Sequence, residues 1–136
     1  MLSVHRSLLT VLSAWHGLAA FKNLCDLCAE FGLVPGARRF GSKNFGAIEK
    51  LLAPARLPRE ALGVLLAGVA AVETAIAVAF ARDRAEPAFA LAIVLFGSFA
   101  LIDETMTDYE LDETHRDILV LILVARLVIG HRESLE

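Results

Sequence analysis

An apolar run from Ala61 to Ala81 limits which folds are open to this chain. Only Glu73 and Thr74 interrupt it. A helix needs about 20 residues to cross the ~30 Å of bilayer hydrocarbon, because each residue advances it by ~1.5 Å. The run therefore predicts a transmembrane helix.

Three further apolar stretches cover residues 8–21 (continuing to about 34), 87–102 and 118–130. Hydrophobic residues make up 57% of the 136 and charged residues 21%, against roughly 45–50% and 25% in soluble domains. The alternative is a soluble bundle, but its helices would need polar outer faces, which 61–81 and 87–102 lack. We therefore expect an integral membrane protein, located in a bacterial inner membrane.

Residues that end or begin helices lie between these stretches. Gly32, Pro35 and Gly36 follow the first, Pro58 precedes the second, and Pro87 opens the third. The pattern predicts an all-α fold, an integral membrane four-helix bundle that forms a single domain over residues 1–136. The expected spans are about 8–33, 60–81, 87–107 and 113–131.

The loop between the first two spans contains a short amphipathic segment, residues 42–53. A helix there would gather its apolar side chains on one face, namely Phe45, Ile48, Leu51 and Leu52. This pattern is typical of a short helix that lies in the membrane interface. A solvated loop with a few apolar anchors is the alternative.

Cys25 and Cys28 form a C-x-x-C motif on the first span. A helix brings both sulfurs to nearly the same face, the arrangement used in thiol–disulfide exchange and in soft-metal sites. Membrane thiol oxidoreductases of the vitamin-K-epoxide-reductase kind place such a pair beside a quinone, but they relay electrons through a second cysteine pair, which this sequence lacks. The neighbouring acids Asp26 and Glu30 disfavour a thiolate. Two small buried apolar side chains are the competing interpretation.

The turn between the last two spans is strongly acidic and contains a candidate metal site. On a helix, Asp112 and His115 could bind one metal together, and Glu104 and Asp108 could supply ligands from the opposite side. Di-metal bundles use two carboxylate–histidine pairs, whereas this chain has one. Acids in the first turn of the last helix also stabilise the positive end of its dipole, so the metal site is kept as an alternative.

Several polar residues lie inside the expected spans, where charge is costly and marks either function or an internal ion pair: His16, Lys22, Asn23, Glu73, Ser98 and Arg126. Glu73 and Arg126 are the formal charges deepest in their spans. At ~1.5 Å per residue they and His16 come within one helical turn of a single plane. We therefore predict a Glu73–Arg126 salt bridge in the bundle interior, with His16 beside it.

Two sequence patterns resemble a known family. They are Gly17-Leu18-Ala19-Ala20-Phe21-Lys22 before a long first loop, and the segment from Leu65 to the lone glutamate Glu73. On these, residues 8–102 resemble the DoxX-like small four-helix membrane proteins, which include the MauE type. The resemblance implies a bundle that accompanies a redox enzyme or assists thiol and quinone chemistry. Only Lys22 and Glu73 match positions that could carry such a role, and the Cys pair and acidic turn have no counterpart there.

These features favour a non-catalytic accessory or structural membrane subunit, with a redox complex as its setting. The alternatives are a thiol- or quinone-linked oxidoreductase that uses Cys25 and Cys28, and a small ion-binding transporter that uses Glu73 and the acidic turn. A quinone or a metal would be the cofactor of those alternatives. The expected partners are the lipid bilayer and other membrane subunits or further copies of the chain. The net charge of −3 offers no footprint for nucleic acid.

Overall fold

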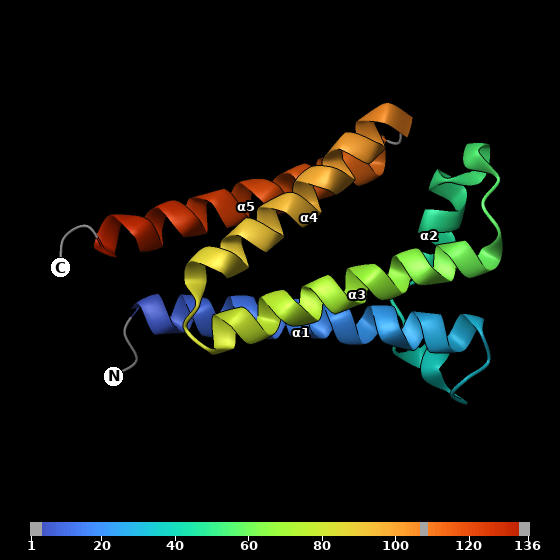
Figure 1. Ribbon diagram of the computed structural model, residues 1–136, viewed down its shortest axis with the longest axis horizontal. Helices are drawn as coiled ribbons and strands as arrows, with labels where there is room; N and C mark the ends of the chain where they lie inside the picture. The colour runs from blue at the N-terminus through green and yellow to red at the C-terminus, as the bar shows by residue number, and fades with distance from the viewer. Residues whose placement is uncertain (1–3, 107–108, 134–136) are drawn as a thin grey trace.

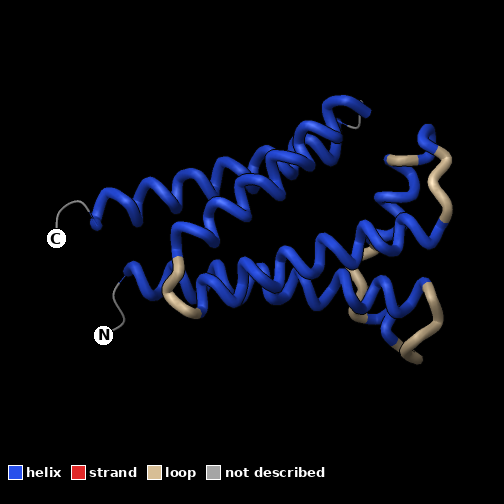
Figure 2. The backbone as a smooth tube through the Cα atoms, in the orientation of Figure 1, coloured by secondary structure: helices blue, strands red, loops and turns tan. Residues whose placement is uncertain are grey.

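The computed structural model describes residues 4–106 and 109–133, with side chains described except at 106, 109–113 and 131–133. Every regular element in this part is helical (Figure 2), which confirms the all-α prediction. The four long helices are α1 (Val4–Glu30), α3 (Arg59–Ala81), α4 (Ala85–Met106) and α5 (Tyr109–Glu133). Between α1 and α3 lie the short helix α2 (Asn44–Leu51) and two 3-10 turns, η1 (Ala37–Arg39) and η2 (Ala53–Ala55).

Helix α1 ends at the glycine that the sequence marks as a breaker. Gly32 adopts a φ of 64°, in the left-handed region that favours glycine. The N–H of Leu33 donates to the carbonyl of Cys28 at 2.8 Å, and the N–H of Gly32 donates to Ala29 at 3.4 Å. These two bonds form a Schellman cap, which satisfies carbonyls left free by the helix end.

The long helices form two antiparallel pairs (Figure 1). Helix α1 packs along α3, α4 packs along α5, and α3 joins the two pairs through its contact with α4. The pairs lie closest together at the end that holds both termini and diverge towards α2. The bundle therefore has a terminal end and a loop end with different packing.

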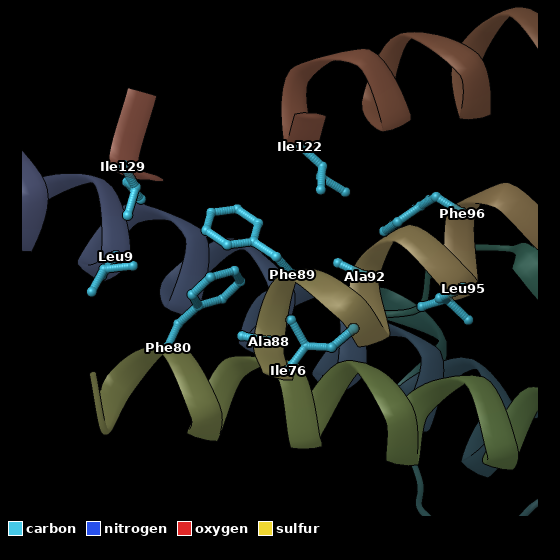
Figure 3. Packing of buried hydrophobic residues seen from close by; sticks show 10 residues of the cluster. All are labelled: Leu9, Ile76, Phe80, Ala88, Phe89, Ala92, Leu95, Phe96, Ile122 and Ile129. Carbon is cyan, nitrogen blue, oxygen red and sulfur yellow. The ribbon is translucent and has the colours of Figure 1, made fainter. Parts of the chain in front are cut away.

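The terminal end is filled by a continuous apolar core to which all four long helices contribute (Figure 3). Its buried members are Leu9, Ile76, Phe80, Ala88, Phe89, Ala92, Leu95, Phe96, Ile122 and Ile129. The rings of Phe80 and Phe89 meet edge to face, with centroids 5.0 Å apart, a favoured arrangement for aromatic pairs. This core fixes how the α1–α3 pair meets the α4–α5 pair.

Two helices are long and apolar enough to cross a membrane: α3 and the part of α4 from Ala85 to Thr105. Large apolar side chains also cover their outer faces, since Val64 is 71% exposed and Leu101 is 72% exposed. Within the described residues α1 and α5 do not meet the same criterion of length and composition. The membrane bundle of four spans therefore stays a prediction.

A helix forms in the first loop where the sequence predicts one, and its apolar face packs against the protein. Phe45 of α2 is buried with Leu62 and Leu66 of α3, and Ile48 and Leu52 pack against them. The apolar spacing in this loop thus reflects a contact with α3. A position of α2 at the membrane interface stays a prediction.

Candidate functional site

A cavity of about 390 Å3 lies between the two helix pairs at the loop end of the bundle. All five α-helices contribute to its wall, which is mostly apolar. The polar residues of the wall are Asn23, Asn44, Glu73, Asp103, Thr114 and His115. A mainly apolar cavity with a few polar groups is the usual form of a small-molecule site.

The first polar cluster of the cavity is centred on Glu73, which lies midway along α3 and is 4% exposed. Its Oε2 accepts a hydrogen bond of 2.8 Å from Nδ2 of Asn23. The Oδ1 of Asn23 accepts two more, from Oγ of Ser42 at 3.0 Å and from Nδ2 of Asn44 at 2.7 Å. Because both ends of the Asn23 amide are engaged, its orientation toward Glu73 is fixed.

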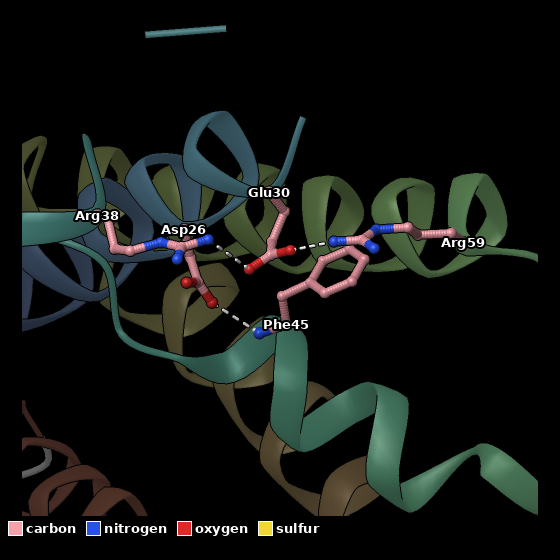
Figure 4. Close-up of polar contacts among 5 residues, drawn as sticks. All are labelled: Asp26, Glu30, Arg38, Phe45 and Arg59. Carbon is pink, nitrogen blue, oxygen red and sulfur yellow. Dashed lines mark hydrogen bonds and ion pairs between the residues drawn. The ribbon is translucent and has the colours of Figure 1, made fainter. Parts of the chain in front are cut away.

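One wall of the cavity is held in place by Asp26 of α1 (Figure 4). Its Oδ2 accepts the backbone N–H of Phe45 at 2.6 Å, a donor in the first turn of α2 that has no acceptor within the helix. Gly41 permits the close approach, because a Cβ there would lie 3.0 Å from Oδ1 of Asp26. Asp26 therefore attaches α2 to α1.

Glu30, one turn beyond Asp26, ties the same region to α3 and to η1 (Figure 4). It forms an ion pair with Arg59 at the start of α3 and another, at 3.7 Å, with Arg38. The guanidinium of Arg59 also lies 5.4 Å from the ring centroid of Phe45. Exposed pairs of this kind contribute little individually, so we regard them as support for the contact made by Asp26.

The second polar cluster faces the cavity from the α4–α5 pair. Asp103 of α4 is 1% exposed, and its Oδ2 contacts Nδ1 of His115 on α5. The ring of Phe99 packs against the imidazole with centroids 5.0 Å apart, and that of Phe96 at 6.4 Å. The Asp103–His115 pair, packed against two aromatic rings, therefore lines the cavity wall opposite Glu73.

The predicted Glu73–Arg126 salt bridge is wrong. Nη2 of Arg126 donates to Oε2 of Glu86 at 3.1 Å, and both side chains are exposed. The inward face of α5 is formed by other residues: Ile118, Leu119, Ile122, Ala125 and Ile129. Because successive residues are rotated by ~100° about a helix, Arg126 turns away from the bundle when Ala125 faces it.

Among the described residues, the other two members of the predicted polar core, Lys22 and His16, do not join the hydrogen-bonded cluster around Glu73. Lys22 is exposed, although Asn23 beside it is buried. His16 is 1% exposed and packs among the rings of Trp15, Phe80 and Phe96, at centroid distances of 5.0 to 6.1 Å. Its Nε2 has no hydrogen-bond partner in the described part of the chain. His16 therefore belongs to the aromatic part of the core.

The thiol pair of the sequence lies outside the cavity. Cys25 and Cys28 are free and half-buried on α1, and neither lines the cavity wall. Glu30 is engaged with Arg59 and Arg38 near this part of the helix. The two sulfurs therefore do not form part of the cavity.

The candidate metal ligands fall partly outside the described residues. Asp108 is one of these, and the side chain of Asp112 is another. Glu104 is exposed and lines a separate shallow hollow, while His115 pairs with Asp103. No group of three His, Cys, Asp or Glu residues that could hold a metal occurs among the described side chains.

From the sequence, Asn23 is one of several polar candidates inside the first span, whereas Asp26 and Asp103 are assigned no site role of their own. A signal for two of them exists, because the buried residues of α1 recur at helical spacing as His16, Ala20, Asn23 and Asp26. Polar residues on the one face that packs against other helices indicate a polar interior at that level. Asp103 has no such signal, since Glu104 beside it has the same chemistry and is exposed.

No family model, curated protein or solved structure matches this chain. The resemblance to DoxX-like proteins therefore stays a prediction. The interpretation of the site rests on its own geometry.

Proposed function

We propose that this chain is an integral membrane protein of four spanning helices whose cavity binds a small molecule without transforming it. The observation that carries the proposal is the cavity itself, an apolar space of about 390 Å3 with two buried polar clusters on facing walls. Such a space suits a molecule with an apolar body and a hydrogen-bonding group. The chain would then be a binding subunit, consistent with the expected accessory role.

The membrane part of the proposal is supported by the outer surface of the bundle. Helix α3 and most of α4 have the length and composition of spans. Helix α5 exposes Leu121 at 66% and Leu127 at 72%. Helices that are apolar on the outside as well as the inside are suited to lipid, and extended apolar surface is rare on soluble monomers.

The cavity favours binding over thiol chemistry. Cys25 and Cys28 do not contribute to its wall, so a molecule held there would not meet the sulfurs. The partner subunits and further copies of the chain expected from the sequence remain predictions. A redox setting would depend on them.

Membrane insertion is tested by extracting cell membranes with alkaline carbonate. We expect the chain to stay in the membrane pellet, as spanning proteins do, because its apolar helices would lose their lipid surroundings on release. Release into the supernatant would contradict the four-span bundle.

Ligand binding is tested by filling the cavity. Ala47 lines the wall from α2, and Ala47→Leu would place an added isopropyl group in the space. The matched control is Ala14→Leu, at an exposed position of α1. After purification in mild detergent, we expect mass spectrometry to find one non-lipid compound on the wild type and on Ala14→Leu, and to find it lost from Ala47→Leu. Recovery of bilayer lipid alone, or equal retention by all three proteins, would contradict the proposal.

A further inference from the structure

Acidic side chains outnumber basic ones among the described titratable residues that line the cavity. Among the described residues these groups are Glu73, Asp103 and His115, and no Lys or Arg lines the wall. His115 contacts Asp103 directly, so that pair can neutralise itself. Glu73 is left with a neutral partner, the amide of Asn23.

Glu73 is therefore a buried carboxyl group without a cation. Its Oε2 accepts the bond from Asn23, and its Oε1 accepts none from the described residues. A buried carboxylate that lacks a cationic partner is costly, and pairing it removes a large part of that cost. A cation in the cavity would supply the missing partner, whereas an anion would increase the repulsion.

The rest of the wall suits the body of such a ligand. The rings of Phe96 and Phe99 line the cavity, and aromatic faces attract ammonium groups. The remaining wall is largely aliphatic, which excludes a small hydrated ion as the occupant because its hydration shell would find few polar partners there. A ligand that matches this cavity therefore carries a positive charge on a hydrocarbon body.

On this basis we infer that the ligand is an organic monocation with an apolar body, such as an alkylated aromatic amine, and that Glu73 binds its cationic group. The inference rests on the proposed function and names the chemical class of the ligand. Asn23, held by Ser42 and Asn44, positions the carboxylate of Glu73. Asp103 and His115 provide the second polar contact.

The competing class is a neutral molecule that the apolar wall holds through its hydrocarbon alone. Benzyltrimethylammonium and neopentylbenzene distinguish the two classes. The two molecules have the same shape, but the central atom is a positively charged nitrogen in the first and a neutral carbon in the second. The full chain is placed in nanodiscs of zwitterionic phosphatidylcholine. Binding of each probe is then measured by equilibrium dialysis against empty nanodiscs.

We expect the wild type to bind benzyltrimethylammonium about tenfold more tightly than neopentylbenzene, as a buried charge pair would allow. Glu73→Gln keeps an acceptor for Asn23 and should remove most of this preference, leaving the affinity for neopentylbenzene unchanged. Glu60→Gln alters an exposed carboxylate at the start of the same helix and should leave both affinities unchanged.

Failure of the inference and failure of the proposed function give different results. Equal or tighter binding of neopentylbenzene by the wild type, blocked by Ala47→Leu, would overturn the cationic ligand and retain the binding cavity. Binding of neither probe above the level of empty nanodiscs would contradict both. Retained binding of neopentylbenzene by Glu73→Gln shows that the variant has kept the cavity.

Discussion

The two ends of the bundle are made by the same long helices and differ in how they are filled. At the terminal end Phe80, Phe89, Ile122 and Ile129 pack into a core. At the loop end the helix pairs diverge and enclose a cavity of about 390 Å3. The inward side chains at each level of the bundle therefore decide whether the helices close on a packed core or leave a cavity.

The inward faces become polar toward the loop end in both helix pairs. Along α1 the buried residues change from Leu9 to Asn23 and Asp26. Along α4 they change from Phe89 to Asp103. Buried polar groups must keep hydrogen-bond partners, so at this level the helices cannot close on an apolar core.

The largest expected effect comes from emptying the packed end. Phe89 is 1% exposed, so Phe89→Ala loses the transfer free energy of the ring and leaves a cavity, which together lower the free energy of unfolding by about 3–5 kcal/mol. Phe99→Ala removes the same ring beside a space that already exists, and we expect about half of that loss. Unfolding in detergent, followed by circular dichroism, measures both.

The control for these two variants is Leu101→Ala, at a side chain on α4 that is 72% exposed. It should change the free energy of unfolding by less than ~0.5 kcal/mol. Equal losses for Phe89→Ala and Phe99→Ala would show that the two ends of the bundle are packed alike.

An intermediate effect is expected at the attachment of α2. Asp26→Ala leaves the buried N–H of Phe45 without its acceptor, which costs about 1–3 kcal/mol. Asp26→Asn keeps an acceptor oxygen and should cost less. Because the contact is confined to the loop end, we expect faster amide hydrogen exchange in residues 41–51 and unchanged exchange around Phe89.

Two results would count against this role of Asp26. One is a uniform rise in exchange along the whole chain, which would mean that Asp26 supports the entire bundle. The other is unchanged exchange in α2, which would mean that the hydrogen bond from Phe45 does not hold the helix.

The smallest effect is expected at Arg126. Its pair with Glu86 is exposed, so Arg126→Ala should change the free energy of unfolding by less than ~1 kcal/mol. Combined with Glu73→Ala, the two changes should add, because the residues share no contact. A marked departure from additivity in unfolding experiments would restore the salt bridge predicted from the sequence.

Much of the secondary structure could be predicted from local signals. Gly32 ends α1 with a Schellman cap, since only a residue that tolerates a positive φ fits there. Pro58 precedes α3, where its fixed φ and missing N–H are tolerated. The apolar spacing of the first loop indicated α2, because periodicity marks the face that becomes buried.

The site could be predicted only in fragments. The isolation of Glu73 in an apolar run marked it as a candidate, and the structure places it on the cavity wall. Its partner was predicted wrongly, because matching depths along two spans does not specify the rotation of each helix. The real partner, Asn23, is one position from the Lys22 that the family resemblance favoured.

The positions of the helices, many of their ends, and the two segments long and apolar enough to cross a membrane follow from the sequence alone. Those properties depend on neighbouring residues along the chain. Packing between helices sets three further features: Asp26 reaches Phe45, Asp103 pairs with His115, and a cavity remains between the helix pairs. The physical reason is that a helix rotation of ~100° separates adjacent residues, so packing against other helices chooses which polar side chain faces inward.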